Sequence, residues 1–197
     1  MHAKRKKPCW VIIFLSPLLL LADAFPLLAH EKWFFSLYGG IYSDTSLIEN
    51  LYFKNAIENS YINVISLGRE LLAHKETIAV EIEGQLGLHC GTQNHQEMNC
   101  VIILRWLSFP WDNYLDTSFA IGNGISYATA DPVIEIENAD YGKTNQWLYY
   151  ILVEWAFTAP SQWEFFWRIH HRSGVYGLMA DPNAGSNFIG VGIRFRF

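Results

Sequence analysis

The stretch NFIGVGIRFRF, residues 187–197, alternates with a period of two up to the aromatic residue that ends the chain. A period of two indicates a β-strand, because successive side chains of a strand point to opposite faces. One face is apolar, and the other carries Arg194 and Arg196. In an outer-membrane barrel the apolar face meets lipid and the arginines point into a polar lumen. A terminal strand that ends in Phe is also typical of the closing strand of such barrels.

The first 24 residues have the organisation of a secretory signal peptide. A basic segment, residues 4–7, precedes an apolar run from Trp10 to Leu21, and Ala22-Asp23-Ala24 then offers a cleavage site. Cleavage after Ala29 is the second choice. The run is shorter than the roughly 20 apolar residues that a spanning helix needs. We therefore expect residues 1–24 to be a signal peptide, residues 30–197 to form one exported barrel, and the bacterial outer membrane to be its location.

Composition favours a small membrane barrel over a soluble enzyme. Aromatic residues make up 16% of the chain and charged residues only 17%, below the roughly 25% of soluble domains. Aromatic residues are expected where such a barrel meets the two membrane interfaces. The net charge of −5 provides no basic patch, so nucleic acid is excluded as a partner.

The alternation repeats along the chain and predicts an all-β fold, an eight-stranded antiparallel transmembrane β-barrel. The expected strands are 33–43, 58–69, 76–89, 100–110, 118–129, 146–158, 162–173 and 187–197. Long connections are expected on the outside at 44–57, 90–99, 130–145 and 174–186, with short turns between them on the periplasmic side. Acidic, basic and histidine side chains then share the lumen. We expect His170 to face inward and to pair with Glu154 or Glu164. A lumen filled in this way argues against a passive pore.

Two cysteines of the exported part flank the second outside connection. Because an exported protein would oxidise such a pair, we expect a disulfide between Cys90 and Cys100. The alternative is a metal site made of His89, Cys90, His95 and Cys100. Its spacing matches no familiar zinc pattern, so the sequence favours the disulfide and no metal.

The candidate for chemistry lies at the outer end of the seventh strand. His171 and Ser173 share the parity of Trp163, Phe165 and Trp167, so both should face lipid, and two residues apart they are neighbours on one face. An imidazole in that position can take the proton of the hydroxyl. Asn187 has the outward parity of the adjacent last strand and should lie beside them. Polar side chains are costly on a lipid-facing surface, which favours a functional site. The alternative is that His171 and Ser173 lie at the membrane interface, where polar side chains are ordinary.

The segments FWRIHHRSG (166–174) and DPNAG (181–185), with the closing strand to Phe197, resemble the C-terminal signature of the lipid A 3-O-deacylase (PagL) family, also described as acyloxyacyl-hydrolase-like. The resemblance implies an eight-stranded outer-membrane barrel. It also implies a lipid-facing Ser-His-Glu triad that hydrolyses the ester-linked 3-hydroxyacyl chain at position 3 of lipid A, without a cofactor. Lipid A of lipopolysaccharide in the outer leaflet would be the partner, and a homodimer is left open.

Carried over by position, the resemblance makes Ser173 the nucleophile and His171 the general base. The acid of the triad falls at Asn187, which can hold the imidazole tautomer but supplies no charge. Gly174 stands where the family usually has Asn, so the oxyanion donor is expected to be Asn183 or a backbone N–H near Gly174. Asp181 is an alternative for the acid, but its spacing in sequence from Ser173 does not match that of the family's Glu. The sequence therefore supports two functions: a lipid A esterase, or a family member with impaired catalysis that is structural or binds lipopolysaccharide.

Overall fold

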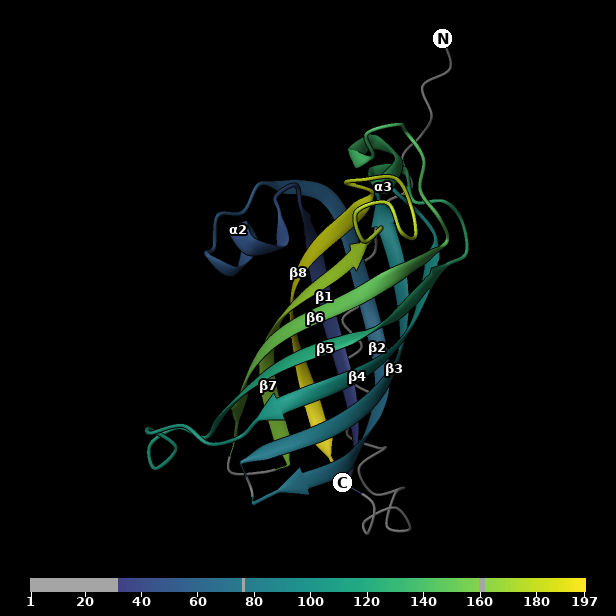
Figure 1. The fold of residues 1–197 in the computed structure, drawn as a ribbon. Helices are drawn as coiled ribbons and strands as arrows, with labels where there is room; N and C mark the ends of the chain where they lie inside the picture. Colours follow the sequence, from purple (N-terminus) through teal and green to yellow (C-terminus); the bar gives the residue numbers. More distant parts are fainter. Residues whose placement is uncertain (1–31, 76, 160–161) are drawn as a thin grey trace.

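Eight antiparallel strands pair in sequence order and close into a barrel in the computed structural model (Figure 1). The structure describes residues 32–75, 77–159 and 162–197. The expected signal peptide, residues 1–24, lies outside them. The strands are β1 (Trp33–Ser43), β2 (Ile57–His74), β3 (Ile78–Gly91), β4 (Gln96–Trp106), β5 (Thr117–Ala128), β6 (Trp147–Thr158), β7 (Trp163–Ser173) and β8 (Gly185–Arg196).

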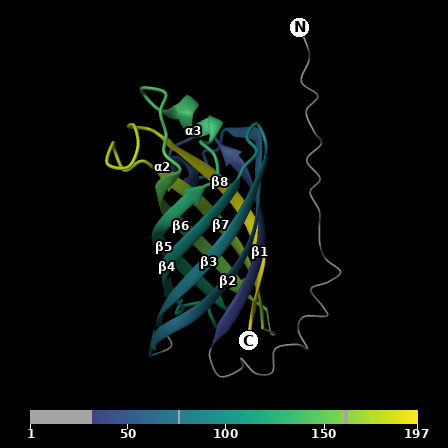
Figure 2. The ribbon, with the colours of Figure 1, turned by 90° about the vertical axis from the view of Figure 1, so that its right-hand side faces the viewer.

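The last strand closes the barrel, as its alternation predicted. Residues 188–196 of β8 pair in register with residues 34–42 of β1, from Tyr42 opposite Phe188 to Phe34 opposite Arg196. β8 also pairs with β7 on its other side. In Figure 2 the strands run obliquely around the barrel, as closure of a sheet requires. No helix among the described residues is long and apolar enough to cross a membrane.

The predicted inward and outward faces are confirmed. On β3, Leu86 and Leu88 are exposed, whereas Glu81 and Glu83 are fully buried. Salt bridges between four strands fill the middle of the lumen: Arg168 binds Glu83 and Glu154 at 2.8 and 2.6 Å, and Arg194 binds Glu154 at 2.8 Å. The exposed apolar side chains face lipid, and the paired charges take the place of an apolar core.

The structure differs from the expected organisation in the partner of His170 and in the lengths of two connections. His170 faces the lumen as predicted, but its Nε2 lies 2.7 Å from Glu97 and not beside Glu154 or Glu164. The register explains the difference, because Leu152 lies opposite His170 and Glu154 lies opposite Arg168. The connections also differ from those expected. β3 and β4 are joined by residues 92–95 alone, and the turn at 107–116 is longer than predicted.

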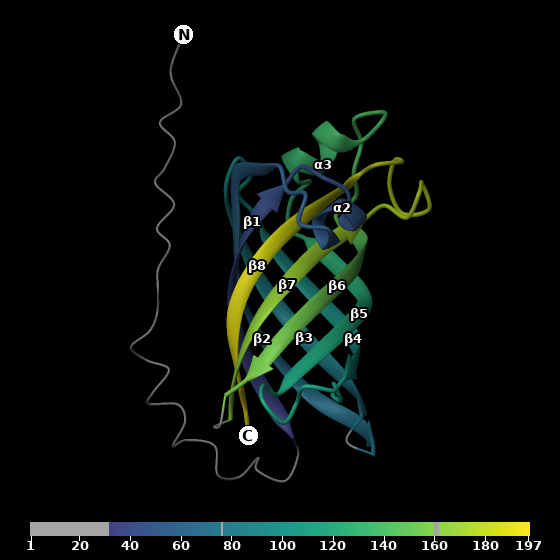
Figure 3. The same ribbon diagram turned by 90° about the vertical axis from the view of Figure 1, so that its left-hand side faces the viewer.

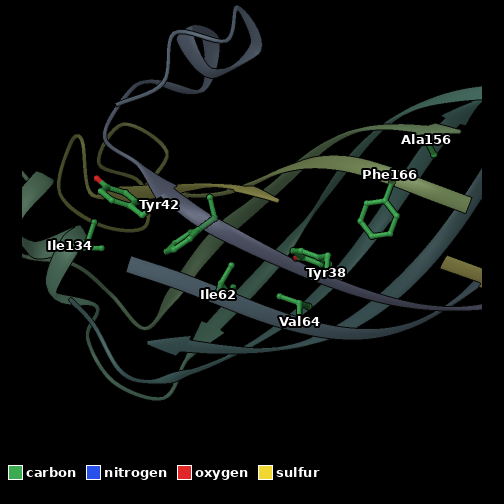
Figure 4. Close-up of a cluster of buried hydrophobic side chains, with 8 residues drawn as sticks. Tyr38, Tyr42, Ile62, Val64, Ile134, Ala156 and Phe166 are labelled. Atoms are coloured by element: carbon green, nitrogen blue, oxygen red, sulfur yellow. The ribbon is translucent and has the colours of Figure 1, made fainter. Parts of the chain in front are cut away.

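Apolar side chains seal the outer end of the barrel. The helix α3 (Val133–Asn138) lies over this end between β5 and β6 (Figure 1). Its Ile134 is buried beside Tyr42 of β1, and the same cluster continues inward to Tyr38 and Phe166 (Figure 4). The shorter helix α2 (Leu47–Leu51) follows β1 and lies outside the barrel wall, next to the ends of β7 and β8 (Figure 3).

Candidate active site

Strand pairing brings the three predicted site residues together. His171 lies directly opposite Asn187 in the β7–β8 ladder, and Ser173 lies opposite Gly185. His171 and Ser173 are half-buried, and Asn187 is 9% exposed. Because Trp167 and Phe165 continue the same face of β7 toward the middle of the barrel, the site opens on the lipid side near the outer end. The arrangement therefore matches the one expected from parity.

A hydrogen bond joins His171 to Asn187 and fixes the imidazole. The distance from His171 Nδ1 to Asn187 Oδ1 is 2.7 Å, and Asn187 Nδ2 donates to the backbone carbonyl of Thr45 at 2.6 Å. A carbonyl only accepts hydrogen bonds, so the NH₂ of the amide must face Thr45 and its oxygen must face the imidazole. His171 consequently carries its proton on Nδ1 and leaves Nε2 with a free lone pair. This is the tautomer that a general base needs.

The Thr45 carbonyl is held by the connection between β1 and β2. The buried side chain of Asn50 donates to that carbonyl at 3.3 Å and accepts from Thr45 Oγ1 at 2.9 Å. Ser46 caps α2 through a capping box with Glu49, in which each side chain satisfies a backbone N–H of the other residue. The hydrogen bonds of Ser46 lower the pKa of Glu49, that from its backbone N–H most strongly, so this carboxylate is ionised at neutral pH.

The helix α2 also contacts the lipid-facing wall below the site. The ring of Phe53, just after α2, packs on Trp167 with the ring centroids 5.3 Å apart. Ile48, Tyr52 and Phe53 are largely exposed, so they present apolar surface beside the site at the level of the membrane interface. Sequence reasoning missed this element, because its only signal is an apolar cluster in a connection.

Ser173 is not yet engaged with the base. Among the described residues no hydrogen bond joins its hydroxyl to His171, and Ser173 Oγ instead accepts from the backbone N–H of Val175 at 3.1 Å. Val175 and Tyr176 have positive φ values of 51° and 52°, a conformation that is unfavourable for a β-branched residue. The connection after β7 is thereby bent so that an N–H faces the hydroxyl. Catalytic hydrogen bonds are often long in the absence of substrate.

The N–H of Gly174, the side chain of Asn183 and the alternative acid Asp181 are hydrogen-bonded elsewhere, whereas the neighbouring backbone N–H of Val175 faces Ser173. The N–H of Gly174 donates to Ala184 at 2.8 Å, and Asn183 Nδ2 donates to Asp140 at 2.8 Å. Asp181 accepts from the backbone N–H of Lys143. A Cβ on Gly174 would lie 3.0 Å from the Asp181 carbonyl oxygen. Close packing of this connection therefore favours glycine where an asparagine was expected.

The predicted disulfide is wrong, and so is the alternative metal set that includes both cysteines. Cys100 is an exposed, free cysteine on β4. It pairs with Gly84, whereas Cys90 pairs with Tyr61 of β2. Six residues of β3 separate Gly84 from Cys90, which is about 20 Å at the rise of a strand, far beyond the roughly 7 Å that a disulfide can bridge. The connection between these strands is too short to bring the two residues together.

Comparisons with known proteins agree with this geometry. The family model described as lipid A 3-O-deacylase (PagL) matches residues 32–196. The crystal structure of the outer membrane enzyme PagL has a TM-score of 0.57 at 9% identity, covering 82% of this chain and 98% of the other. A solid-state NMR structure of outer membrane protein AlkL in lipid bilayers matches with a TM-score of 0.41 at 11% identity, covering 85% and 90%. No curated protein sequence matches.

Proposed function

Because the chain belongs to the lipid A 3-O-deacylase family, we propose that it removes an ester-linked 3-hydroxyacyl chain from lipid A by a Ser-His mechanism. The protein is a bacterial outer-membrane barrel, and its site opens toward the leaflet that holds lipopolysaccharide. The substrate can thus reach the site without leaving the membrane. The observation that carries the proposal is the contact from Thr45 through Asn187 to His171, which leaves the correct nitrogen free to act as a base.

The chemistry follows from these positions. Ser173 Oγ attacks the ester carbonyl carbon while His171 Nε2 takes the hydroxyl proton. The tetrahedral intermediate collapses, the sugar oxygen leaves with the proton from His171, and the acyl group remains on Ser173. Water then attacks the acyl-serine, His171 accepts a proton from the water and returns it to Ser173 Oγ, and the 3-hydroxy acid is released. No step uses a cofactor.

Asn187 performs one of the two tasks of a triad acid. Its oxygen orients the imidazole and selects the tautomer, but an amide supplies no charge to stabilise the imidazolium that forms. The reaction is therefore expected to be slower than with a carboxylate in that position, and not abolished. For the oxyanion we favour the N–H of Val175, which lies 3.1 Å from Ser173 Oγ and would turn from that oxygen to the carbonyl oxygen of the substrate once Ser173 attacks.

A groove on the barrel wall offers a place for an acyl chain. It has a volume of about 370 Å³ and is lined by residues 39–41 of β1, 61–63 of β2 and 189–191 of β8. It begins two residues from Asn187 along β8, and most of its lining is apolar. Gly39 leaves space in it, since the nearest atom to an added Cβ is Asn63 Oδ1 at 3.7 Å. We assign this groove to an acyl chain of the substrate.

The test is hydrolysis by the purified barrel in detergent micelles. Parent protein should release 3-hydroxy fatty acid from lipid A, and Ser173→Ala should release none while both give the same heat-modifiable gel mobility. Absence of release by a folded parent protein would contradict the proposal.

A second function is favoured by the amide at position 187 and by the missing contact between Ser173 and His171. A family member with impaired catalysis could bind lipopolysaccharide or stabilise the membrane. In that case the folded parent and Ser173→Ala would bind lipopolysaccharide equally, and neither would hydrolyse it. The possible homodimer receives no support from the described residues.

A further inference from the structure

Two histidines and a glutamate meet inside the outer end of the barrel. His89 ends the inward face of β3, His95 lies in the connection that follows, and Glu97 begins the inward face of β4. One ligand atom from each of the three lies within 4.8 Å of the others, and all three residues are buried. His89 Nε2 is 2.7 Å from Glu97 Oε2, and the rings of His89 and His95 stack with their centroids 4.2 Å apart.

Two buried polar atoms of this cluster have no hydrogen-bond partner among the described residues: His95 Nε2 and Gln93 Oε1. His95 is 8% exposed and Gln93 3%, so leaving these atoms unpaired is unfavourable. His95 Nε2 is therefore available to a metal ion, which binds the unprotonated nitrogen of an imidazole.

Glu97 lies among several charged and polar side chains. Arg172 pairs with Glu135 of α3 at 2.8 Å and lies 3.8 Å from Glu97, so one arginine faces two carboxylates. One carboxylate oxygen of Glu97 is held by the imidazole of His170 at 2.7 Å and the hydroxyl of Ser126 at 3.1 Å. The other oxygen contacts His89 at 2.7 Å and has only the more distant Arg172 besides, so it is the oxygen that an ion beside His89 would bind.

From these observations we propose that His89, His95 and Glu97 form a binding site for a divalent transition-metal ion of the zinc type. Two imidazoles and one carboxylate are a known donor set for Zn²⁺, with water as the fourth ligand. Tetrahedral zinc places its ligand atoms roughly 3.3 Å apart. The atoms now up to 4.8 Å apart must therefore approach by up to about 1.5 Å, and His89 Nε2 and Glu97 Oε2, now 2.7 Å apart, must separate by about 0.6 Å. His95 lies in a connection and can turn out of its stacked position to do so.

Binding would satisfy both orphaned atoms. The ion replaces the proton between His89 Nε2 and Glu97, and His95 Nε2 gains a metal bond. The proton of His89 then resides on Nδ1, which Gln93 Nε2 now approaches at 3.2 Å. Rotation of the Gln93 amide would turn its unpartnered oxygen toward that proton. A histidine that binds a metal ion usually donates its other ring N–H to such an acceptor. The proton of His89 moves from one ring nitrogen to the other, so binding needs no net release of a proton from this ring.

The site would act on the barrel and not on the ester. Its three residues face the lumen, whereas Ser173 and His171 face lipid on the other side of the wall. The ion would link His95, in the segment between β3 and β4, to Glu97, and Glu97 also binds His170 of β7. These links would stabilise the outer end of the barrel.

The test uses untagged, refolded barrel of the variant Cys100→Ser treated with chelator, so that the exposed free cysteine on β4 does not compete. Zinc alone is the probe, followed by competition with a chromophoric chelator and by elemental analysis. We expect one zinc per barrel, at least tenfold weaker binding in His95→Ala, and unchanged binding in His74→Ala, which removes an exposed histidine at the far end of β2. Ser173→Ala should bind zinc as the parent does.

A second readout separates binding from loss of fold. Zinc should raise the temperature at which the folded gel band disappears for the parent and His74→Ala, and should leave it unchanged for His95→Ala. The proposal is overturned if the folded parent retains no more zinc than His95→Ala, or if zinc raises the unfolding temperature of both equally.

Discussion

Replacing Asn187 by leucine tests how the site prepares its base. Leucine has nearly the shape of asparagine but cannot accept the hydrogen bond that His171 Nδ1 donates at 2.7 Å. Leaving a half-buried N–H unpaired costs about 1–3 kcal/mol, and each 1.36 kcal/mol is a factor of ten in rate. We therefore expect kcat to fall roughly 10- to 100-fold. Substrate binding should change less, because Asn187 contacts the base and not the ester.

The companion variant Asn187→Asp separates the two contacts of the amide. It keeps an oxygen for His171 and adds a charge, but it places a second oxygen against the Thr45 carbonyl, where the amide now donates at 2.6 Å. Asn187→Asp should therefore retain clearly more activity than Asn187→Leu. Asn113→Leu, in the turn at the opposite end of the barrel, is the control for loss of an amide.

The assay is the initial rate of 3-hydroxy fatty acid release from lipid A by purified protein in micelles, over a range of substrate concentrations. Equal kcat for Asn187→Leu and the parent would refute the argument that Asn187 orients the base. Equal losses in the aspartate and leucine variants would show that the contact with Thr45, and not the acceptor for His171, is what matters.

Three other outcomes follow from the structure. Arg168→Leu leaves Glu83 without its buried arginine and removes one of the arginines that bind Glu154. It should cost about 3–5 kcal/mol in urea unfolding, against about 0–1 kcal/mol for Lys32→Met, which breaks the exposed pair with Glu70; similar losses would contradict the account of the lumen. The lowered pKa of Glu49 means that α2 gains stability from this carboxylate at neutral pH and loses it as the pH falls through the depressed pKa; hydrogen exchange of residues 44–56, corrected for intrinsic rates, should speed up in acid for the parent but not for Glu49→Gln. Gly39→Leu, whose Cβ meets no atom closer than 3.7 Å, places a side chain in the groove and should lower kcat/KM several-fold at unchanged unfolding temperature; an unchanged kcat/KM would remove the groove from the substrate site.

Much of the barrel could be predicted because alternation is local. The residues of the closing strand alone determine which side chains face lipid, and the same parity placed His171, Ser173 and Asn187 on one face before any pairing was known. The register of β7 and β8 then brings them together. Strand ends were less predictable, since β3 continues to Gly91 and β4 begins at Gln96, both within what was expected to be the outside connection 90–99.

The contacts that complete the site lie outside such local patterns. The carbonyl of Thr45 is 142 positions from Asn187 in the chain, and any residue could supply it. The N–H of Val175 depends on a backbone conformation that no side-chain pattern encodes. The disulfide was predicted from compartment and proximity in sequence, but strand register places Cys90 and Cys100 far apart on the barrel wall.

The most direct test of the central claim is mass spectrometry of lipid A from Gram-negative cells that express this chain, beside cells that express Ser173→Ala. The account predicts that lipid A loses one 3-hydroxyacyl chain with the parent and none with the variant. Unchanged lipid A in both strains, with each protein folded in the outer membrane, would contradict it and favour a barrel that binds or supports lipopolysaccharide without cutting it.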